Sequence, residues 1–489
     1  MMHDKNGLKV AKVELFKVPP RWLFLKITTE NGLVGWGEPV VEGRAATVET
    51  AIHELLPCLI GHPANKIEDF WQMVFRGGFY RGGPVLMSAL SGIDQALWDI
   101  KGKALGVPIY ELLGGSVRDK MKIYGWVHGN TTDELAKAAK KRIENGFTAV
   151  KMIVTDNLEW IDAPYKVNDA AKRLAAVREA IGDKYPIGVD FHGRVHKGMV
   201  KMMAEALAPY QPYFLEEAVL SENNEALASL QSFTSIPIAT GERMYSRWDF
   251  KKIIQDGLVD IVQPDLSHAG GISEVKRIAT MAEAYDIAIA PHCPLGPISL
   301  AAALQIDFSC INALIQETSL GIPYNSDYEL TDYLKDPNVF GLKEGFVPRP
   351  TAAGLGIEID EDKVRAAAAI GHDWKNETGS LEPLLDTILE SIPAPEKKEG
   401  VLRMKITSLD FSSFTGRIAI GRIHQGSIAV GQSLGLTKKD DTVKRVRIKE
   451  LHVFEGLGKR SLDKVECGDI CAVTGIEDFE IGDTVTDFD

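Results

Sequence analysis

The segment GVDFHGR, residues 188–194, ends a short apolar run on an aspartate and places a histidine two positions further on. Similar apolar runs recur along the chain with helical stretches between them: TAVKMIV (148–154), IGVDF (187–191), YFLEE (213–217), IPIATGE (236–242), VDIVQPD (259–265), IAIAPH (287–292) and NALIQE (312–317). Alternation of strands and helices at this rhythm is typical of a parallel sheet with helices outside. Seven or eight such units predict a closed (β/α) barrel, which we place at residues 123–376.

Different patterns flank this region. Residues 1–122 predict an α+β domain, in which strands come first, a hairpin is expected at Asn31-Gly32, and helices follow from about residue 45. Residues 377–400 predict a helix and the linker PAPEKKEG. Residues 401–489 consist of short strands with turn signals, which predict a small all-β barrel. The predicted architecture is therefore α/β, with a small all-β domain at the end.

Composition excludes several classes of protein. The chain has 489 residues and a formal net charge of -13, which makes it a poor candidate for wrapping nucleic acid. Its five cysteines form no CxxC pair, which favours a reducing, cytoplasmic setting and disfavours a thiolate zinc site. Residues 287–306 contain no Asp, Glu, Lys or Arg, but their prolines predict a buried strand, a turn and a buried helix rather than a membrane span. The first residues lack the layout of a signal peptide.

From the second of these apolar runs onward, each predicted barrel strand ends near one acid or base. These residues are separated by 23 to 27 positions: Asp190, Glu216, Glu242, Asp265, His292 and Glu317. A single aspartate at a strand end is usually a helix cap, but six titratable residues in succession are hard to explain as caps. In this fold the carboxyl ends of the strands carry the chemistry, so we expect one site there.

Five carboxylates in one site would repel one another unless a cation offset their charge. Asp190, Glu216 and Glu242 offer hard oxygen ligands that suit Mg²⁺, whereas no cysteine or second histidine joins this trio to favour zinc. His192 and His292 lie on opposite sides of the trio in strand order. A carboxylate such as Asp265, one strand before His292, would fix the tautomer of that imidazole.

These residues resemble the enolase superfamily, in which an α+β capping domain precedes the barrel. The segment ALWDIKGKALGVPIYELLGG (96–115) is similar to the superfamily's connection between cap and barrel. Finer motifs resemble the galactonate dehydratases of that superfamily over residues 8–375: WGEPVVEGRAATVE (36–49), RGGFYRGGP (76–84), VDFHGRVHK (189–197), QPDLSHAGGISE (263–274), APHCPLGPISLAAALQID (290–307) and QETSLG (316–321).

The resemblance implies a role for each site residue. It implies that Asp190, Glu216 and Glu242 bind Mg²⁺, that His292 paired with Asp265 removes the proton next to the substrate carboxylate, that His192 protonates the departing 3-hydroxyl, and that Glu317 hydrogen-bonds the developing enediolate. The expected reaction converts D-galactonate to 2-dehydro-3-deoxy-D-galactonate and water. Five residues are candidates for contacts with the substrate: Arg21, Trp22, Tyr80, Arg81 and Lys151. For the first four, a purely fold-stabilising role is an open alternative.

Three positions depart from the family pattern without removing a predicted catalytic residue. Ile153 stands where a polar residue is expected, Ala218 where proline is expected, and Pro323 where histidine is expected. A dehydratase acting on another aldonate therefore stays open as an alternative. Members of the superfamily commonly form symmetric oligomers, so we also expect a homo-oligomer.

The C-terminal segment resembles the second domain of translational GTPases of the BipA/TypA type, joined abruptly as in a fusion. The chain contains no GxxxxGK[ST] phosphate loop, so we expect no nucleotide hydrolysis. The basic run VKRVRIKE (443–450) is either a solvated strand face or a contact with the ribosome. A third hypothesis is therefore a ribosome-associated binding module with an impaired barrel.

Overall fold

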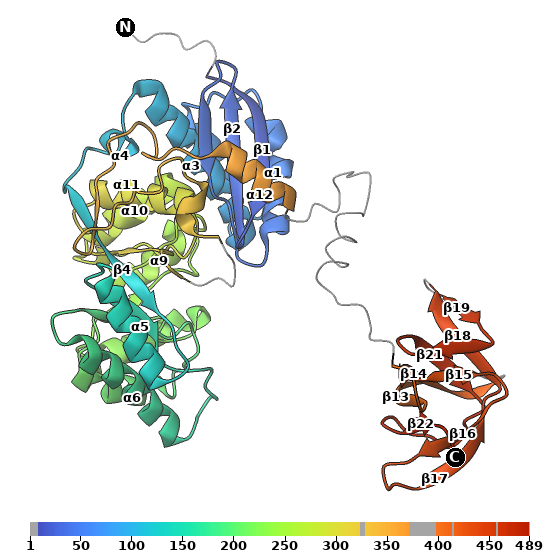
Figure 1. Cartoon of the computed structure of the whole chain (residues 1–489). Coiled ribbons are helices and arrows are strands. Elements are labelled where there is room, and N and C mark those ends of the chain that lie inside the picture. Colours follow the sequence, from blue (N-terminus) through green and yellow to red (C-terminus); the bar gives the residue numbers. More distant parts are fainter. Residues whose placement is uncertain (1–7, 323–327, 371–397, 413–414, 456–457, 489) are drawn as a thin grey trace. The chain divides into compact units, whose positions relative to one another are not determined.

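The computed structural model describes residues 8–322, 328–370, 398–412, 415–455 and 458–488, and Figure 1 shows the course of the chain. The chain divides into two compact units, residues 1–373 and residues 374–489. The helix predicted at 380–392, most of the predicted linker and Pro323 lie outside the described residues. Each unit has its own hydrophobic core and is described by itself.

The first unit begins with an antiparallel sheet and a layer of helices, which together form the predicted cap. Its elements are β1 (Val10–Val18), β2 (Trp22–Thr29), β3 (Val34–Gly37), α1 (Ala45–Leu59), α2 (Ile67–Gly77), α3 (Pro84–Leu105) and α4 (Ile109–Leu112). The hairpin predicted at Asn31-Gly32 is confirmed, because β2 and β3 pair on either side of it. A Cβ on Gly37 would lie 1.9 Å from the carbonyl oxygen of Gly92, so glycine is what lets α3 pack against β3.

A ring of parallel strands follows, as the sequence predicts. The strands are β4 (Lys120–Val127), β5 (Val150–Ile153), β6 (Ile187–Asp190), β7 (Phe214–Glu216), β8 (Ile238–Thr240), β9 (Ile261–Val262), β10 (Ala288–Ile289) and β11 (Gln316–Glu317). Neighbours in the chain are neighbours in the sheet from β4 to β10. The ring closes because Ile289 bridges Ala313 and β11 pairs with β4.

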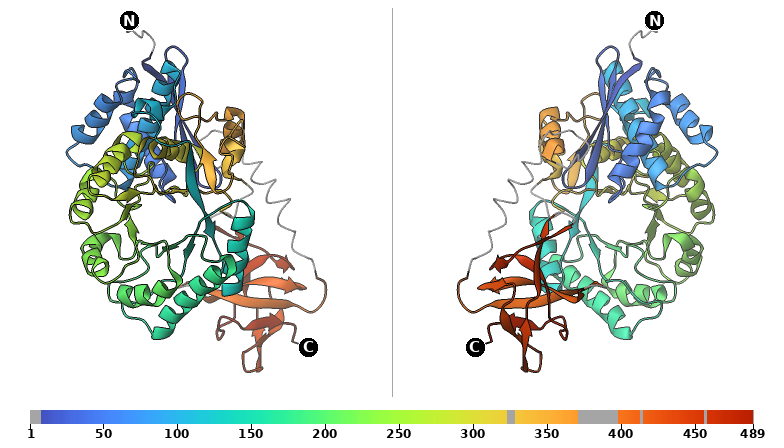
Figure 2. Two further views of the ribbon diagram at one scale, coloured as in Figure 1. Left: turned by 90° about the vertical axis from the view of Figure 1, so that its left-hand side faces the viewer. Right: turned by 90° about the vertical axis from the view of Figure 1, so that its right-hand side faces the viewer.

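Helices surround this ring (Figure 2). They are α5 (Thr132–Glu144), α6 (Pro164–Ile181), α7 (Val200–Leu207), α8 (Leu227–Gln231), α9 (Arg247–Gln255), α10 (Gly271–Glu283) and α11 (Pro297–Ser309), with 3-10 turns η1 (Ala208–Tyr210) and η2 (Ser221–Ala226). The uncharged stretch 287–306 forms β10, a turn and the wholly buried α11, as predicted. No helix within the described ranges has the length and apolar character needed to cross a membrane.

The middle of the ring is closed by packed side chains. One cluster contains a buried residue from most of the strands: Tyr124, Ala149, Phe214, Ala239, Ile261, Ala290 and Ile315. Because this plug fills the interior, a ligand reaches the strands only at their ends. The packing therefore restricts the chemistry to the carboxyl-end surface.

After the ring the chain returns to the cap through η3 (Leu330–Tyr333), β12 (Phe346–Pro348) and α12 (Glu361–Ile370). β12 pairs antiparallel with β4. Glu361 at the start of α12 lies 2.7 Å from the ammonium of Lys26 in β2. The segment after the ring is thus tied to the barrel by β12 and to the cap by Glu361.

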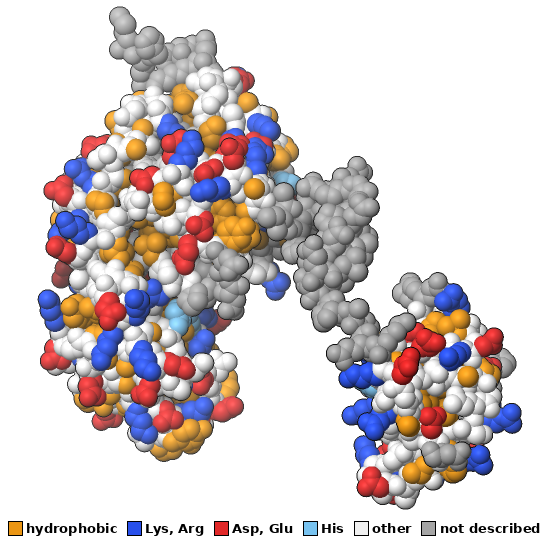
Figure 3. All heavy atoms as spheres, viewed as in Figure 1, with side chains coloured by type: hydrophobic (Ala, Val, Ile, Leu, Met, Phe, Trp, Pro, Cys, Tyr) orange, Lys and Arg blue, Asp and Glu red, His pale blue; other side chains and the backbone are white. Residues whose placement is uncertain are grey.

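The second unit is an antiparallel all-β domain. Its strands are β13 (Arg403–Ser412), β14 (Gly416–Gln425), β15 (Ser427–Ala429), β16 (Ser433–Thr437), β17 (Val443–Arg447), β18 (Glu450–Glu455), β19 (Gly458–Ser461), β20 (Lys464–Glu466), β21 (Ile470–Thr474) and β22 (Thr484–Thr486). Eight of these strands form one sheet in the order β17-β16-β22-β13-β14-β21-β18-β19. Part of the predicted basic run forms the edge strand β17, in which Lys444 pairs with Asp478 and Arg445 lies over the ring of Phe488. Charges of both signs are interspersed over the surface in Figure 3.

Candidate active site

The six acids and bases predicted at strand ends all lie at the carboxyl end of the ring. β6, β7 and β11 end at Asp190, Glu216 and Glu317. The other three follow β8, β9 and β10 within a few residues: Glu242, Asp265 and His292. A bridge between Asp265 and His292 continues the pairing of β9 with β10 beyond the strands. The sheet therefore brings together the residues that are spread over 128 positions of sequence from Asp190 to Glu317.

His292 is held by a carboxylate on one side. Its Nδ1 lies 2.8 Å from Oδ2 of Asp265, and its Nε2 lies 3.4 Å from Oε2 of Glu242. Burial alone would lower the pKa of His292, but Glu242 and Glu317 outweigh burial and raise this pKa well above its ordinary value. Because Asp265 occupies Nδ1, Nε2 is the nitrogen available to a ligand in the pocket.

His192 and Asp190 interact at the end of β6. Nε2 of His192 lies 2.9 Å from Oδ2 of Asp190, and its backbone N–H donates to Oδ1 at 2.7 Å. The backbone of His192 has a φ of 49°, and that of Glu217 a φ of 47°; both lie in the left-handed region that residues other than glycine adopt mainly at special sites. Burial would raise the pKa of Asp190, but Lys151 and His192 lower it to about 2.

Lys151 lies beneath the site as a fully buried cation. Its Nζ is 2.7 Å from Glu216, 3.4 Å from Glu317 and 3.5 Å from Asp190. It also lies 4.6 Å from the centre of the ring of Trp126. Burial alone would lower the pKa of Lys151, but Glu216 and Glu317 outweigh it and raise this pKa. Lys151 thus supplies a fixed positive charge below the carboxylates.

The predicted metal ligands fit a hard divalent cation. Ligand atoms of Asp190, His192 and Glu242 all lie within 4.8 Å of one another. Oε2 of Glu242 is buried and accepts no hydrogen bond from the residues that the structure describes. Glu216 is a predicted metal ligand, but its oxygens already accept hydrogen bonds from the protein. Lys151 and Gln263 each donate to one of these oxygens at 2.7 Å. A carboxylate has about four lone-pair sites, so both oxygens of Glu216 keep acceptor capacity.

Glu317 accepts hydrogen bonds inside the barrel. Its Oε1 receives the indole N–H of Trp126 at 2.6 Å, and its Oε2 receives the backbone N–H of Cys293 at 3.2 Å. Burial would raise the pKa of Glu317, but Lys151 and His292 lower it below its ordinary value. The structure therefore places an ionised Glu317 between the pocket wall and the loop that carries His292.

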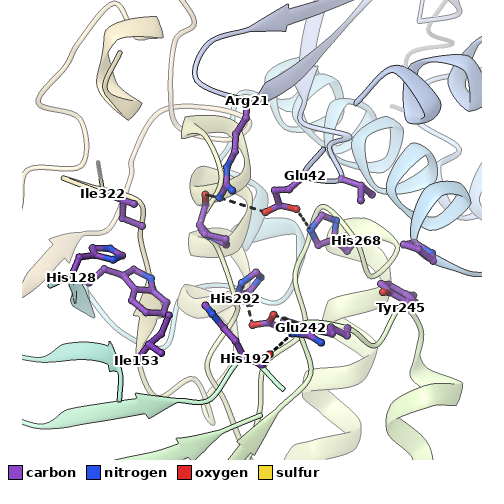
Figure 4. A pocket seen from close by; sticks show the side chains of 15 residues that line it. Arg21, Glu42, His128, Ile153, His192, Glu242, Tyr245, His268, His292 and Ile322 are labelled. Carbon is purple, nitrogen blue, oxygen red and sulfur yellow. Dashed lines mark hydrogen bonds and ion pairs between the residues drawn. The ribbon is translucent and has the colours of Figure 1, made fainter. Parts of the chain in front are cut away.

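A pocket of about 430 Å³ opens above these groups, between the barrel and the cap. Of the predicted catalytic and metal residues, His192, Glu242 and His292 line it, and Arg21 of the cap lines it as predicted for a substrate contact (Figure 4). Asp190, Glu216, Asp265, Glu317 and Lys151 are fully or almost fully buried below. The floor of the pocket is therefore a layer of charged side chains, most of which are shielded from water.

Four of the five predicted substrate contacts do not line this pocket: Lys151 is buried below it, and the other three belong to the cap. Trp22 is buried in the cap core, where it stacks on Phe24. Tyr80 is 86% exposed, and Arg81 donates to backbone carbonyls of Arg76 and Gly78 in the same loop. Sequence similarity could place these side chains near the barrel but could not show which way they point.

Two of the departures from the family pattern can be located. Ile153 lines the pocket, so an apolar side chain takes the place of the expected polar one. Ala218 is buried beside Glu217, whose side chain lies 2.8 Å from the guanidinium of Arg243.

Sequence reasoning missed several polar groups that line the pocket, His268 and Arg243 among them. His268 lies 3.4 Å from Glu42 and 3.8 Å from Asp265. Arg243 also lines the pocket and donates to the backbone carbonyl of His192 at 2.9 Å. A usable signal existed for His268 and Arg243, since each follows a predicted site residue within three positions.

Comparison with known proteins agrees with this fold. Family models match at residues 19–114 (mandelate racemase / muconate lactonizing enzyme, N-terminal domain), 134–363 (enolase C-terminal domain-like) and 416–486 (elongation factor Tu domain 2). A member of the enolase superfamily from Salmonella Typhimurium superposes with a TM-score of 0.68 at 29% identity, over 73% of this chain and 97% of that one. A mandelate racemase/muconate lactonizing enzyme from Jannaschia sp. CCS1 gives a TM-score of 0.68 at 30% identity, over the same shares.

The capping domain, the closed ring and the carboxylates at its strand ends define an enzyme of the enolase superfamily, followed by a domain similar to domain 2 of elongation factor Tu. D-galactonate dehydratases from Pectobacterium atrosepticum and Ralstonia pickettii are 52% identical over 369 residues, which cover 76% of this chain and 97% of each relative. The chain belongs to the D-galactonate dehydratase family.

Proposed function

We propose that this chain catalyses the Mg²⁺-dependent dehydration of D-galactonate to 2-dehydro-3-deoxy-D-galactonate and water. The observation that carries the proposal is the cluster of Asp190, His192 and Glu242 beside His292 at one pocket, with Glu216 buried below. The name of the 52% identical relatives supports the choice of substrate. The reaction removes the proton from C2 and hydroxide from C3, and the resulting enol rearranges to the 2-keto product. It needs a base, an acid and compensation for negative charge.

His292 is the proposed base. Asp265 holds Nδ1 at 2.8 Å, so that Nε2 of the neutral imidazole accepts the C2 proton. Glu242 raises the pKa of His292, and a cation bound to Glu242 would offset that effect and favour the neutral form. Loss of that proton places a second negative charge on the substrate carboxylate as an enediolate forms. We assign Glu317 the predicted hydrogen bond to this species, and its contacts with Trp126 and Lys151 fix its position.

Asp190, Glu216 and Glu242 are the proposed ligands of Mg²⁺. The ion, when bound, offsets the charge that develops on the substrate carboxylate. Lys151 adds a permanent positive charge below Glu216, at a place that the substrate does not reach in the described packing. The charge of Lys151 lowers the pKa of Asp190 and of Glu317 and so keeps these two carboxylates ionised in a buried position.

His192 is the proposed acid. Hydroxide is a poor leaving group, so C3–O cleavage requires a proton donor. His192 lines the pocket, and its Nε2 lies 2.9 Å from Oδ2 of Asp190. A water molecule leaves from C3 as the donor proton joins the hydroxyl.

The choice among aldonates is set by the upper pocket. Arg21 is the one predicted cap contact that lines it, and Ile153 faces the same space. A dehydratase of another aldonate is the second candidate function, favoured by the apolar side chain of Ile153 where a polar contact is expected. Trp22, Tyr80 and Arg81 do not enter this proposal because of their positions.

Compartment and partners follow from less specific observations. All five cysteines are free thiols in the structure, which supports a reducing, cytoplasmic compartment. Resemblance to the superfamily supports a homo-oligomer. The match to elongation factor Tu domain 2 supports a ribosome contact only as the alternative role of the second unit.

The test is an assay for 2-keto-3-deoxy acids with Mg²⁺ and several aldonates. We expect turnover of D-galactonate, and a decrease of about 100- to 10,000-fold in the His292→Asn variant. His53→Asn is the control, because His53 is exposed on α1. Turnover of a different aldonate alone would favour the second candidate. Turnover of none, together with salt-sensitive co-sedimentation with ribosomes, would support the binding-module hypothesis instead.

A further inference from the structure

The cap side of the pocket carries a carboxylate that the proposed reaction does not use. Glu42 lies in the segment after β3 and lines the same pocket as His292 and Glu242. Its Oε2 is 3.4 Å from Nε2 of His268, and its Oε1 is 3.7 Å from Nη2 of Arg21. Figure 4 shows Glu42 and His268 on the side of the pocket toward Arg21, away from His192.

His268 is fixed from behind by the cap. Its Nδ1 lies 3.1 Å from the hydroxyl of Ser88 in α3, and its imidazole is buried. Burial would lower the pKa of His268, but Asp265 and Glu42 raise it. Burial would raise the pKa of Glu42, but His268 lowers it to about 2. The pair is therefore ionic, and Glu42 is a pure hydrogen-bond acceptor.

Glu42 retains unused acceptor capacity. Its two cationic contacts, at 3.4 and 3.7 Å, are longer than an ordinary N–H···O hydrogen bond. Within the described part of the chain no shorter polar contact reaches this carboxylate. A carboxylate offers about four lone-pair sites, so several positions remain for hydroxyl donors from a ligand.

A carboxylate in the pocket of an anionic substrate restricts how that substrate binds. It repels the substrate's own carboxylate and attracts uncharged hydroxyl groups. A sugar acid has its carboxylate at one end and a row of hydroxyls at the other. Glu42 therefore favours the orientation that sends the acid group away from the cap, toward the Mg²⁺ that Asp190 and Glu242 would hold.

We propose that Glu42, held by His268 and Arg21, binds the distal hydroxyl groups of an acyclic sugar acid and sets the preference for long aldonates. The inference rests on the proposed function, because Mg²⁺ held by the carboxylates at the strand ends would take the acid end of the same molecule. Neighbouring hydroxyls of a polyol can donate to the two oxygens of one carboxylate, as charge-assisted hydrogen bonds. Glu42 is a specificity-determining residue in this scheme and takes no part in proton transfer.

The test compares D-galactonate with the four-carbon aldonate of the same configuration at C2 and C3, which lacks the distal hydroxyls. In Glu42→Gln we expect kcat/KM to fall about 10- to 100-fold for D-galactonate and to stay within about threefold for the short acid. Glu42→Asp, which keeps the charge but shortens the side chain, should show the same selective loss. Glu49→Gln is the matched control, because Glu49 is a cap carboxylate paired with Lys17 at 2.9 Å outside the pocket.

The second readout is the Kd of the same two acids, measured by calorimetry on the full chain carrying His292→Asn. If adding Glu42→Gln raises the Kd of D-galactonate but not that of the short acid, the inference is supported. This readout holds even if the wild type turns over neither acid and the proposed function fails. An equal loss of affinity for both acids, or no loss for D-galactonate, would overturn the role of Glu42. Turnover by the wild type would not be affected by that result, so the two proposals can fail separately.

Discussion

Removing the cation beneath the site should destabilise the first unit in a pH-dependent way. Lys151→Met keeps a similar side-chain volume but withdraws the charge that lies 2.7 to 3.5 Å from Glu216, Glu317 and Asp190. Without this partner, at least one carboxylate that is ionised in the wild type must take up a proton in the folded state. Breaking a buried ion pair commonly costs about 3–5 kcal/mol, since the remaining charge has no compensation.

The cost can be worked out from protonation alone. The pKa of Asp190 is about 2 and that of Glu317 is below its ordinary value, so both are ionised at pH 7. A carboxyl group has a pKa near 4 in the unfolded chain, and holding its proton above that pH costs about 1.4 kcal/mol per pH unit. At pH 7, about three units higher, the cost is roughly 4 kcal/mol. At pH 5 the same step costs only about 1–1.5 kcal/mol. The penalty should therefore shrink as the pH falls.

Urea unfolding followed by tryptophan fluorescence measures this penalty in the intact chain. Seven of the eight tryptophans lie in the first unit, and the eighth, Trp374, is the first residue of the second unit, so the signal reports chiefly the first unit. The control is Lys17→Met, because Lys17 pairs with Glu49 at 2.9 Å while 34% of its side chain is exposed. We expect the control to lose no more than about 1 kcal/mol at either pH.

The pH dependence is what distinguishes this reasoning from a simple loss of packing. A decrease in the free energy of unfolding that is the same at pH 5 and pH 7 would mean that Lys151 acts by packing over Trp126 rather than by charge. A decrease no larger than that of Lys17→Met would mean that the carboxylates below the pocket are neutral in the native chain. Either result would refute the electrostatic role assigned to Lys151.

Two further predictions concern metal and pH. Mg²⁺ should raise the melting temperature of the wild type, measured by calorimetry, but not that of Asp190→Asn. An equal rise in both proteins would mean that the ion binds elsewhere. Glu38 is fully buried and accepts backbone N–H groups of Gly296 and Ser299 at 2.6 and 3.0 Å, and burial raises its pKa to about 8. The folded state then holds a proton that the unfolded chain releases near pH 4.5, so stability should fall as the pH rises from about 4.5 to 8. Glu38→Gln should flatten that fall in unfolding curves, and an unchanged slope would show that Glu38 is ionised throughout.

The sequence predicts the barrel because its signal is repeated. One apolar run that ends on an acid, such as the run before Asp190, says little by itself. Six runs at intervals of 23 to 27 residues leave few alternatives to a ring of parallel strands. The same repetition identifies the residues at the strand ends, since the ends of parallel strands meet at one edge.

Side-chain direction could not be predicted in the same way. Trp22 follows the alternation of a strand but points into the cap core, and Tyr80 lies in a glycine-rich loop whose course no periodicity determines. The partners of Glu216 depend on Lys151 and Gln263, which come from two other strands. Such contacts are fixed by tertiary packing, on which local sequence patterns carry no information.

The cap and the barrel share one polar network, and this explains why the pocket cannot be assigned to either part alone. Gln95 of α3 accepts the backbone N–H of Glu38 and donates to the hydroxyl of Ser267, whose own backbone N–H donates to Asp265. The carboxylate of Glu38 in turn holds the backbone that follows His292. Since unpaired buried polar groups are costly, a shift of the cap would break bonds on both sides of the proposed base. The position of His292 therefore depends on cap residues as much as on the strand that precedes it.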